Sequence, residues 1–79
     1  MPIKVFLAVN IKSGKAKEVH KSLTDIDAVK LACVVSDGEY DIVAMIEVPS
    51  LDEYRTFSVD KVSGVPHITD YTSFIIMDE

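Results

Sequence analysis

The chain has 79 residues, of which 48% are hydrophobic and 27% are charged. This length favours a single domain, expected over residues 1–79, and the composition excludes a disordered chain. Thirteen acidic residues against eight basic ones give a net charge of −5, which argues against direct binding of nucleic acid. No apolar run approaches the ~20 residues of a membrane span, and no signal peptide is evident, so we expect no membrane contact and a cytoplasmic location.

The first predicted strand spans residues 3–12, because apolar residues alternate along it. Its apolar side consists of Ile3, Val5, Leu7, Val9 and Ile11. Ser13-Gly14 interrupts this alternation and can cap a helix that runs from about Lys15 to Thr24-Asp25. A second strand follows over residues 28–35, and it contains the single Cys33, which excludes an internal disulfide and which we expect to be buried.

A polar turn, Ser36-Asp37-Gly38-Glu39-Tyr40, separates this strand from a third strand over residues 41–48. The Asp37-Gly38 pair is typical of a hairpin. We expect Gly38 to permit a backbone bend that a β-carbon would hinder.

A second helix is predicted from the capping-box pattern Ser50-Leu51-Asp52-Glu53, in which each polar side chain satisfies a free backbone N–H. The period of its apolar residues becomes irregular near the end, at Val62. We expect Gly64 to close this helix in a left-handed conformation and Pro66 to prevent its resumption. Residues 68–77 form the last strand. The element order predicts an α+β fold, a ferredoxin-like βαββαβ sandwich with a four-stranded antiparallel sheet.

The strands carry more apolar residues than one covered face requires. If Ile42, Ala44 and Ile46 face the helices, the opposite face presents Phe6, Ala8, Val43 and Met45, together with one side of the last strand. An apolar area of this size is unfavourable in water, and a second copy of the sheet is the simplest cover for it. We therefore expect a homodimer with face-to-face sheets, a dimeric α/β-barrel-type assembly.

No catalytic or metal-binding set emerges from the reactive side chains. His20 and His67 lack a second His or Cys at ligand spacing, and Cys33 lies in an apolar strand. Asp41 and Glu39 flank an exposed tyrosine, where nothing desolvates them. The sequence thus predicts no enzyme, no metal and no cofactor.

The last strand carries a row of polar residues that an apolar strand does not explain. They are Thr69, Asp70, Tyr71, Thr72 and Ser73. Hydroxyls and a carboxylate near a turn with free N–H groups suit a small zwitterion, although a plain hairpin remains an alternative.

Several segments together resemble one known family. They are Gly38-Glu39-Tyr40-Asp41-Ile42-Val43, Val48-Pro49-Ser50-Leu51-Asp52-Glu53-Tyr54, Gly64-Val65 and Thr72-Ser73-Phe74-Ile75-Ile76-Met77. In order and spacing they resemble the C-terminal effector domain, or RAM domain, of the Lrp/AsnC (feast/famine) transcription regulators. The Gly-x-Tyr-Asp turn is the most specific element of this resemblance.

The resemblance implies an amino-acid effector, bound in clefts between dimers that assemble into higher homo-oligomers. It implies that Gly38, Glu39 and Tyr40 offer backbone groups, and that Asp41 holds the turn or contacts the effector's ammonium group. The other implied effector-binding residues are Thr72, Ser73, Leu51 and Phe74.

The chain departs from the family in two ways. Its first strand begins at Ile3, which leaves no room for the family's helix-turn-helix, so it resembles a stand-alone RAM domain. Asp37 stands where the family more often has Thr or Ser, which implies a longer loop. The predicted function is an amino-acid sensor that modulates full-length regulators or a metabolic enzyme. A small dimeric α/β-barrel enzyme using His20 or Tyr54, and a ligand-free oligomerisation partner, remain alternatives.

Overall fold

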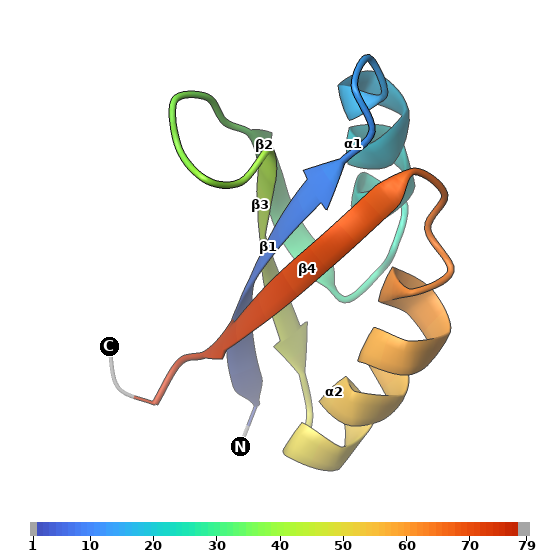
Figure 1. Cartoon of the computed structure of the whole chain (residues 1–79). Coiled ribbons are helices and arrows are strands. Elements are labelled where there is room, and N and C mark those ends of the chain that lie inside the picture. Colours follow the sequence, from blue (N-terminus) through green and yellow to red (C-terminus); the bar gives the residue numbers. More distant parts are fainter. Residues whose placement is uncertain (1, 78–79) are drawn as a thin grey trace.

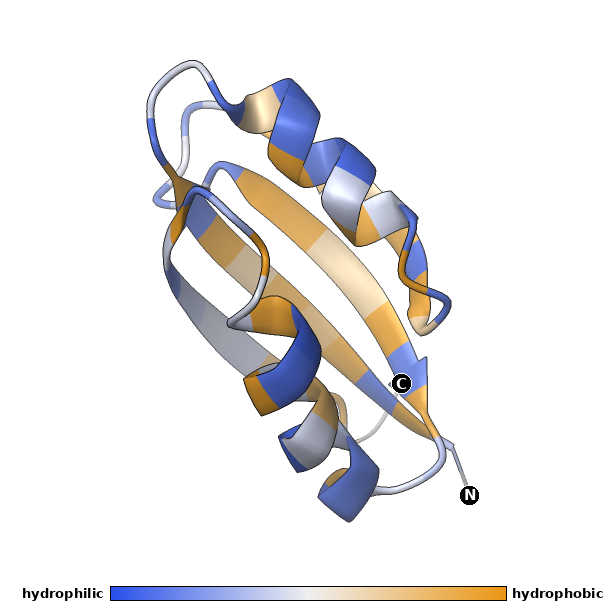
Figure 2. Cartoon of the chain, turned by 90° about the vertical axis from the view of Figure 1, so that its right-hand side faces the viewer, coloured by the Kyte–Doolittle hydropathy of each residue, from blue (hydrophilic) through white to orange (hydrophobic). Residues whose placement is uncertain are grey.

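A computed structural model of the protein describes residues 2–77. The elements are β1 (Ile3–Ile11), α1 (Ala16–Thr24), β2 (Val29–Val34), β3 (Ile42–Val48), α2 (Leu51–Phe57), the π-helical turn η1 (Ser58–Val62) and β4 (Ile68–Ile75). The strands form one antiparallel sheet in the order β2-β3-β1-β4 (Figure 1). Both helices lie on the same face of this sheet (Figure 2). This arrangement confirms the predicted α+β, ferredoxin-like βαββαβ fold.

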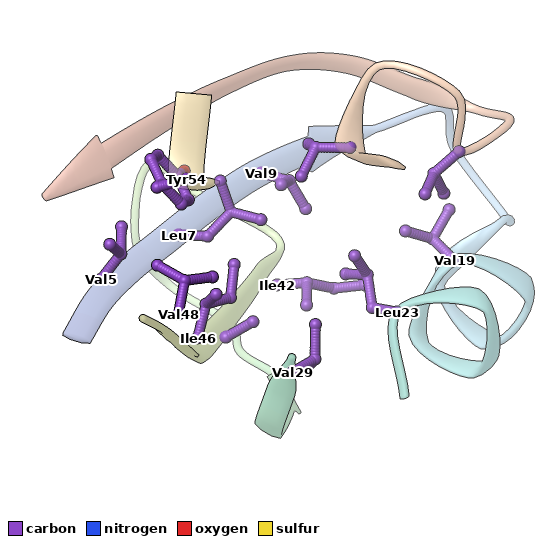
Figure 3. Close-up of a cluster of buried hydrophobic side chains, with 13 residues drawn as sticks. Val5, Leu7, Val9, Val19, Leu23, Val29, Ile42, Ile46, Val48 and Tyr54 are labelled. Atoms are coloured by element: carbon purple, nitrogen blue, oxygen red, sulfur yellow. The ribbon is translucent and has the colours of Figure 1, made fainter. Parts of the chain in front are cut away.

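The core lies between the helices and the apolar side of the two central strands. The register places Val5, Leu7 and Val9 opposite Ile46, Ala44 and Ile42 respectively, so β1 and β3 direct the same kind of side chain towards the helices. Val19 and Leu23 of α1 and Tyr54 of α2 belong to the same cluster (Figure 3). The alternation in the sequence predicted these orientations because successive side chains of a strand point to opposite faces.

The opposite face of the sheet carries no helix, and we call it the open face. Phe6, Leu31 and Phe74 lie on it with exposed fractions of 44%, 62% and 53%. Phe6 is paired with Phe74 across β1 and β4, and Leu31 with Met45 across β2 and β3. The predicted burial of Cys33 is wrong for the chain alone, because this residue is opposite Val43 on the open face and is half-buried.

The loop before α1 turns at Gly14, whose φ of 81° lies in the left-handed region that glycine adopts without strain. The helix follows from Ala16, and its N-cap residue Lys15 makes no capping hydrogen bond through its side chain. The Ser13-Gly14 pair therefore acts as a turn and does not supply the predicted cap. No helix within residues 2–77 has the length and apolar character needed to cross a membrane.

The second helix begins as predicted but ends differently. The Ser50 hydroxyl accepts a hydrogen bond from the Glu53 backbone N–H at 3.2 Å, which is half of the predicted capping box. In η1 the Ser63 N–H donates to the Ser58 carbonyl at 3.1 Å, a bond five residues long. This wider turn accommodates the irregular apolar period and still buries Val62 completely.

The predicted left-handed conformation of Gly64 is wrong. The left-handed residue after η1 is His67, with φ of 74°. The His67 carbonyl accepts a hydrogen bond from the Lys12 N–H at 2.9 Å, which ties the start of β4 to the end of β1. The chain thus leaves the π-helical turn and reverses direction at His67, directly after Pro66.

Candidate functional site

The turn between β2 and β3 is fixed to the rest of the molecule by Asp41. One oxygen of its carboxylate accepts a hydrogen bond from the Ile11 N–H at 3.0 Å. Its own N–H donates to the Val9 carbonyl at 3.0 Å, and its carbonyl accepts from the Val35 N–H at 2.9 Å. These three bonds continue the sheet beyond the first residue of β3, so Asp41 holds the base of the turn.

The tip of the turn is exposed and contains one left-handed residue, which is Asp37 with φ of 65°. Aspartate tolerates this region better than most residues. The expectation that Gly38 provides the bend is therefore wrong. Gly38 is not left-handed, and a β-carbon added there would meet no atom within 4 Å. Nothing within the described chain requires glycine at this position.

Tyr40 connects the turn to the last strand. Its hydroxyl donates a hydrogen bond to the Thr72 side-chain oxygen at 3.1 Å. Thr72 is opposite Ala8, and β1 lies between β3 and β4, so the Tyr40 side chain crosses β1 on the open face. The structure thus brings together two of the residues that the sequence predicted as a site.

Ser73 is separated from Thr72 because neighbouring residues of a strand face opposite sides. It is opposite Leu7 on the helix side of the sheet, where its hydroxyl forms a hydrogen bond with the Tyr54 hydroxyl. Burial raises the pKa of Tyr54, and the bond with Ser73 offsets part of that rise. Within one chain, Ser73 therefore does not reach the turn.

Further hydroxyls extend this contact between α2 and β4. Tyr71 forms a hydrogen bond with Ser58 at 2.8 Å and a longer one with Ser63 at 3.5 Å, and these bonds lower the pKa of Tyr71. Ser58 and Ser63 were not among the residues predicted from the sequence to lie at a site. Their five-residue spacing, equal to that of Phe57 and Val62, is the signal that could have placed them on one side of a π-helical turn.

The two remaining predicted residues lie apart from the turn. Leu51 is the first residue of α2, at the other end of β3, and Figure 1 shows these parts at opposite ends of the molecule. Phe74 lies on the open face opposite Phe6. A single chain therefore brings Gly38 to Asp41 together with Thr72, whereas Ser73 and Leu51 lie away from this turn.

The other candidate groups have structural partners. The His20 Nε2 atom lies 2.9 Å from the Ala32 carbonyl oxygen, and the His67 Nε2 atom lies 3.3 Å from the Glu18 carboxylate. Among residues 2–77, no cluster of His, Cys, Asp or Glu has the arrangement of a metal site. A hollow of about 390 Å³ lies beside Asp41 on the side of α1, bordered by Lys12 and Gly14.

Comparison with known proteins identifies the family of this fold. A family model described as the Lrp/AsnC ligand binding domain matches residues 4–79. The chain is 30% identical to hypothetical protein PHS023 from Pyrococcus horikoshii, over 98% of this chain and 92% of that chain, with a TM-score of 0.89. No curated protein sequence matches the chain.

Two transcription regulators share the fold at lower identity. E. coli AsnC is 19% identical, with a TM-score of 0.91, over 98% of this chain and 52% of its own. Transcriptional regulator NMB0573 from Neisseria meningitidis, solved as a complex with L-Met, is also 19% identical. Its TM-score is 0.86, over 98% of this chain and 51% of its own. The chain spans about half the length of each regulator. Because the family model matches nearly all of its residues, the chain belongs to the Lrp/AsnC ligand-binding domain family.

Proposed function

We propose that this chain is a non-catalytic amino-acid-binding module that assembles through the open face of its sheet and modulates a partner regulator or metabolic enzyme. The family is one of ligand-binding domains, and a regulator with the same fold was solved with L-Met. The chain as a whole, residues 1–79, acts as one such domain in this proposal.

The observation that carries the proposal is the set of free backbone N–H groups in the turn between β2 and β3. Within the part of the chain that the structure describes, the N–H groups of Gly38, Glu39 and Tyr40 donate to no other group. Successive free N–H groups on a turn suit a carboxylate. Asp41 fixes the base of this turn, and Tyr40 fixes its side towards β4.

The ammonium group of an amino acid needs an acceptor close to the same turn. Asp37 and Glu39 are exposed there, while one oxygen of Asp41 is already occupied by the Ile11 N–H. We therefore assign the turn-holding role to Asp41 and the ammonium contact to a neighbouring carboxylate or carbonyl. Ser73, Leu51 and Phe74 contribute from another subunit, if at all, through packing around the cleft.

In this proposal, the chain dimerises through the exposed apolar residues of the open face. A second copy would cover Phe6, Leu31 and Phe74 together, and a ligand held between such dimers would favour higher oligomers through its differential affinity for them. An enzyme in the space between sheet and helices is disfavoured. His20 and Tyr54, the groups that it would use, are already engaged by Ala32 and Ser73.

Calorimetric titration against each standard amino acid tests the proposal. We expect heat of binding for at least one amino acid and an accompanying change in oligomeric state. Gly38→Ala is the informative variant, because the fold has space for the added methyl group while the ligand's carboxylate would approach that backbone closely. It should bind at least about tenfold more weakly, a loss of roughly 1.4 kcal/mol, with undiminished stability. If no heat of binding is measured at millimolar ligand and the oligomeric state is unchanged, the proposal is wrong and the chain is a ligand-free oligomerisation partner.

A further inference from the structure

Two surface hollows adjoin on the helix side of the molecule. One, of about 380 Å³, lies between the end of β3 and the helical segment formed by α2 and η1. The other, of about 400 Å³, is bordered by the segment that links α1 to β2. Ala28, Phe57 and Lys61 line both hollows, so the two are neighbours, and we call them together the interhelical groove. The two helices stand apart on this face (Figure 2).

The floor of the interhelical groove is apolar. Val48 belongs to the core, and Ile26, Ala28 and Phe57 pack against the core while remaining partly exposed. The Phe57 ring stacks on Tyr54 with the ring centres 5.9 Å apart, which holds it in place. An apolar side chain of a partner would find a preformed surface here.

The rim of the groove is acidic. Five of the chain's thirteen acidic residues line it, but only one of its eight basic residues does so. The acidic residues are Asp25, Asp27, Glu47, Glu53 and Asp60, and the basic residue is Lys61. Glu47 alternates with the buried Ile46 and Val48, so its side chain points to the open face. Of the other four, Asp25 pairs with Lys21 at 3.2 Å, whereas Asp27, Glu53 and Asp60 form no ion pair within residues 2–77. The groove therefore offers unpaired negative charge around an apolar floor.

We propose that the interhelical groove binds a segment of a partner protein that presents an apolar side chain flanked by Lys or Arg residues. The apolar side chain would cover Phe57 and Ala28, and the flanking cations would face Glu53 and Asp60. Nucleic acid is excluded by the sign of the charge. The groove and the open face lie on opposite sides of the sheet, so a module dimerised through the open face keeps the groove accessible.

A second copy of the chain fits the groove less well. Its helix α1 carries Lys17 and Lys21, and Lys15 directly precedes the helix, so this segment would match the acidic rim in charge. However, none of the exposed large hydrophobic residues of the described chain belongs to α1. A copy could therefore supply the charge but not the apolar contact, whereas a basic amphipathic segment supplies both.

The test uses a fluorescein-labelled helical peptide of about 15 residues with leucines on one face and lysines elsewhere. We expect its fluorescence anisotropy to rise on titration with the protein, and backbone amide NMR shifts to concentrate at Ala28, Val48, Phe57 and Lys61. A peptide with the same leucines and with glutamates in place of the lysines should not bind. Absence of binding by the lysine peptide at low ionic strength would overturn the proposal.

Matched variants separate the groove from general attraction to an acidic protein. Glu53→Lys changes a residue of the rim, and Asp52→Lys makes the same change in net charge at the adjacent position, which does not line the groove. Glu53→Lys should weaken peptide binding about fivefold, the order of one ion pair at a surface, and Asp52→Lys should have much less effect. Three results would each contradict the proposed occupant. The two variants could weaken peptide binding equally, or the NMR shifts could be confined to the open face. The protein could also self-associate in a way that Glu53→Lys abolishes, which would make a second copy the occupant.

Discussion

Asp41 matters to this molecule first as an anchor for the backbone of β1. Its carboxylate accepts the Ile11 N–H at a point where β3 has not yet begun. Asp41→Ala should lower the free energy of unfolding by about 1–2 kcal/mol, because it leaves that N–H without its partner. Asp41→Asn keeps a carbonyl oxygen and should lose less. Urea unfolding of the three proteins measures the difference, and an alanine variant as stable as the wild type would contradict the anchoring role.

Tyr54 makes the free energy of unfolding depend on pH in the alkaline range. Burial raises its pKa in the folded state, so the folded chain holds the phenolic proton at a pH where the unfolded chain has lost it. This contribution is fully present below about pH 10, the usual pKa of tyrosine, and declines as the pH rises further. Tyr54→Phe should be about 1 kcal/mol less stable at pH 8, and the gap should narrow above pH 10.

Urea midpoints of the wild type and of Tyr54→Phe, measured at pH 8 and above pH 10, test this expectation. Tyr71 is present in both proteins, so the opposite shift of its pKa largely cancels from the comparison. A gap that stays constant across the two conditions would show that Tyr54 does not ionise more readily in the unfolded chain.

At the scale of elements, the alternation of apolar residues predicted most of the fold, whereas the expected roles of Gly38 and Gly64 in their turns were wrong. The sides of β1 and β3 followed from residues such as Leu7 and Ile42, because only one face of the sheet can be buried against helices. The same rule separates Thr72 from Ser73, which the predicted site had grouped. The π-helical turn was not predicted, because the short irregular period before Gly64 is also compatible with a frayed helix end.

The position of the polar turn was predictable from the sequence, but its backbone conformation was not. The sequence identified Gly38 to Asp41 as a polar turn, yet the left-handed residue proved to be Asp37. The bonds that hold the base of this turn come from distant segments, namely the N–H of Ile11 and the carbonyl of Val9, and no local sequence pattern contains them. The contact between Tyr40 and Thr72 likewise depends on the order of the strands.

The start of α2 depends on one hydroxyl group. Ser50→Ala removes the acceptor for the Glu53 N–H and should cost about 1 kcal/mol, since an alanine cannot cap. Ser50→Asp should restore most of this loss because aspartate caps equally well. Thermal or urea unfolding of the pair provides the measurement, and equal losses in both variants would attribute the effect to something other than the cap.

For the whole molecule, the open face should determine the oligomeric state. Phe74→Asp places a charge where the proposal packs one sheet against another, and it should shift the sedimentation coefficient from an oligomer towards a monomer. Val59→Asp is the matched control, because Val59 is also exposed but lies on η1, on the helix side. If the wild type and both variants have the same sedimentation coefficient, the open face is not the interface of the oligomer.

The most direct test of the central claim is a crystal structure of the protein grown with a mixture of amino acids. The account predicts sheets packed face to face through Phe6 and Phe74, with density for an amino acid beside Gly38 to Asp41. The ligand's carboxylate should lie within hydrogen-bond distance of the free N–H groups of that turn. An amino acid bound between the sheet and the helices, or a turn left empty at saturating ligand, would contradict it.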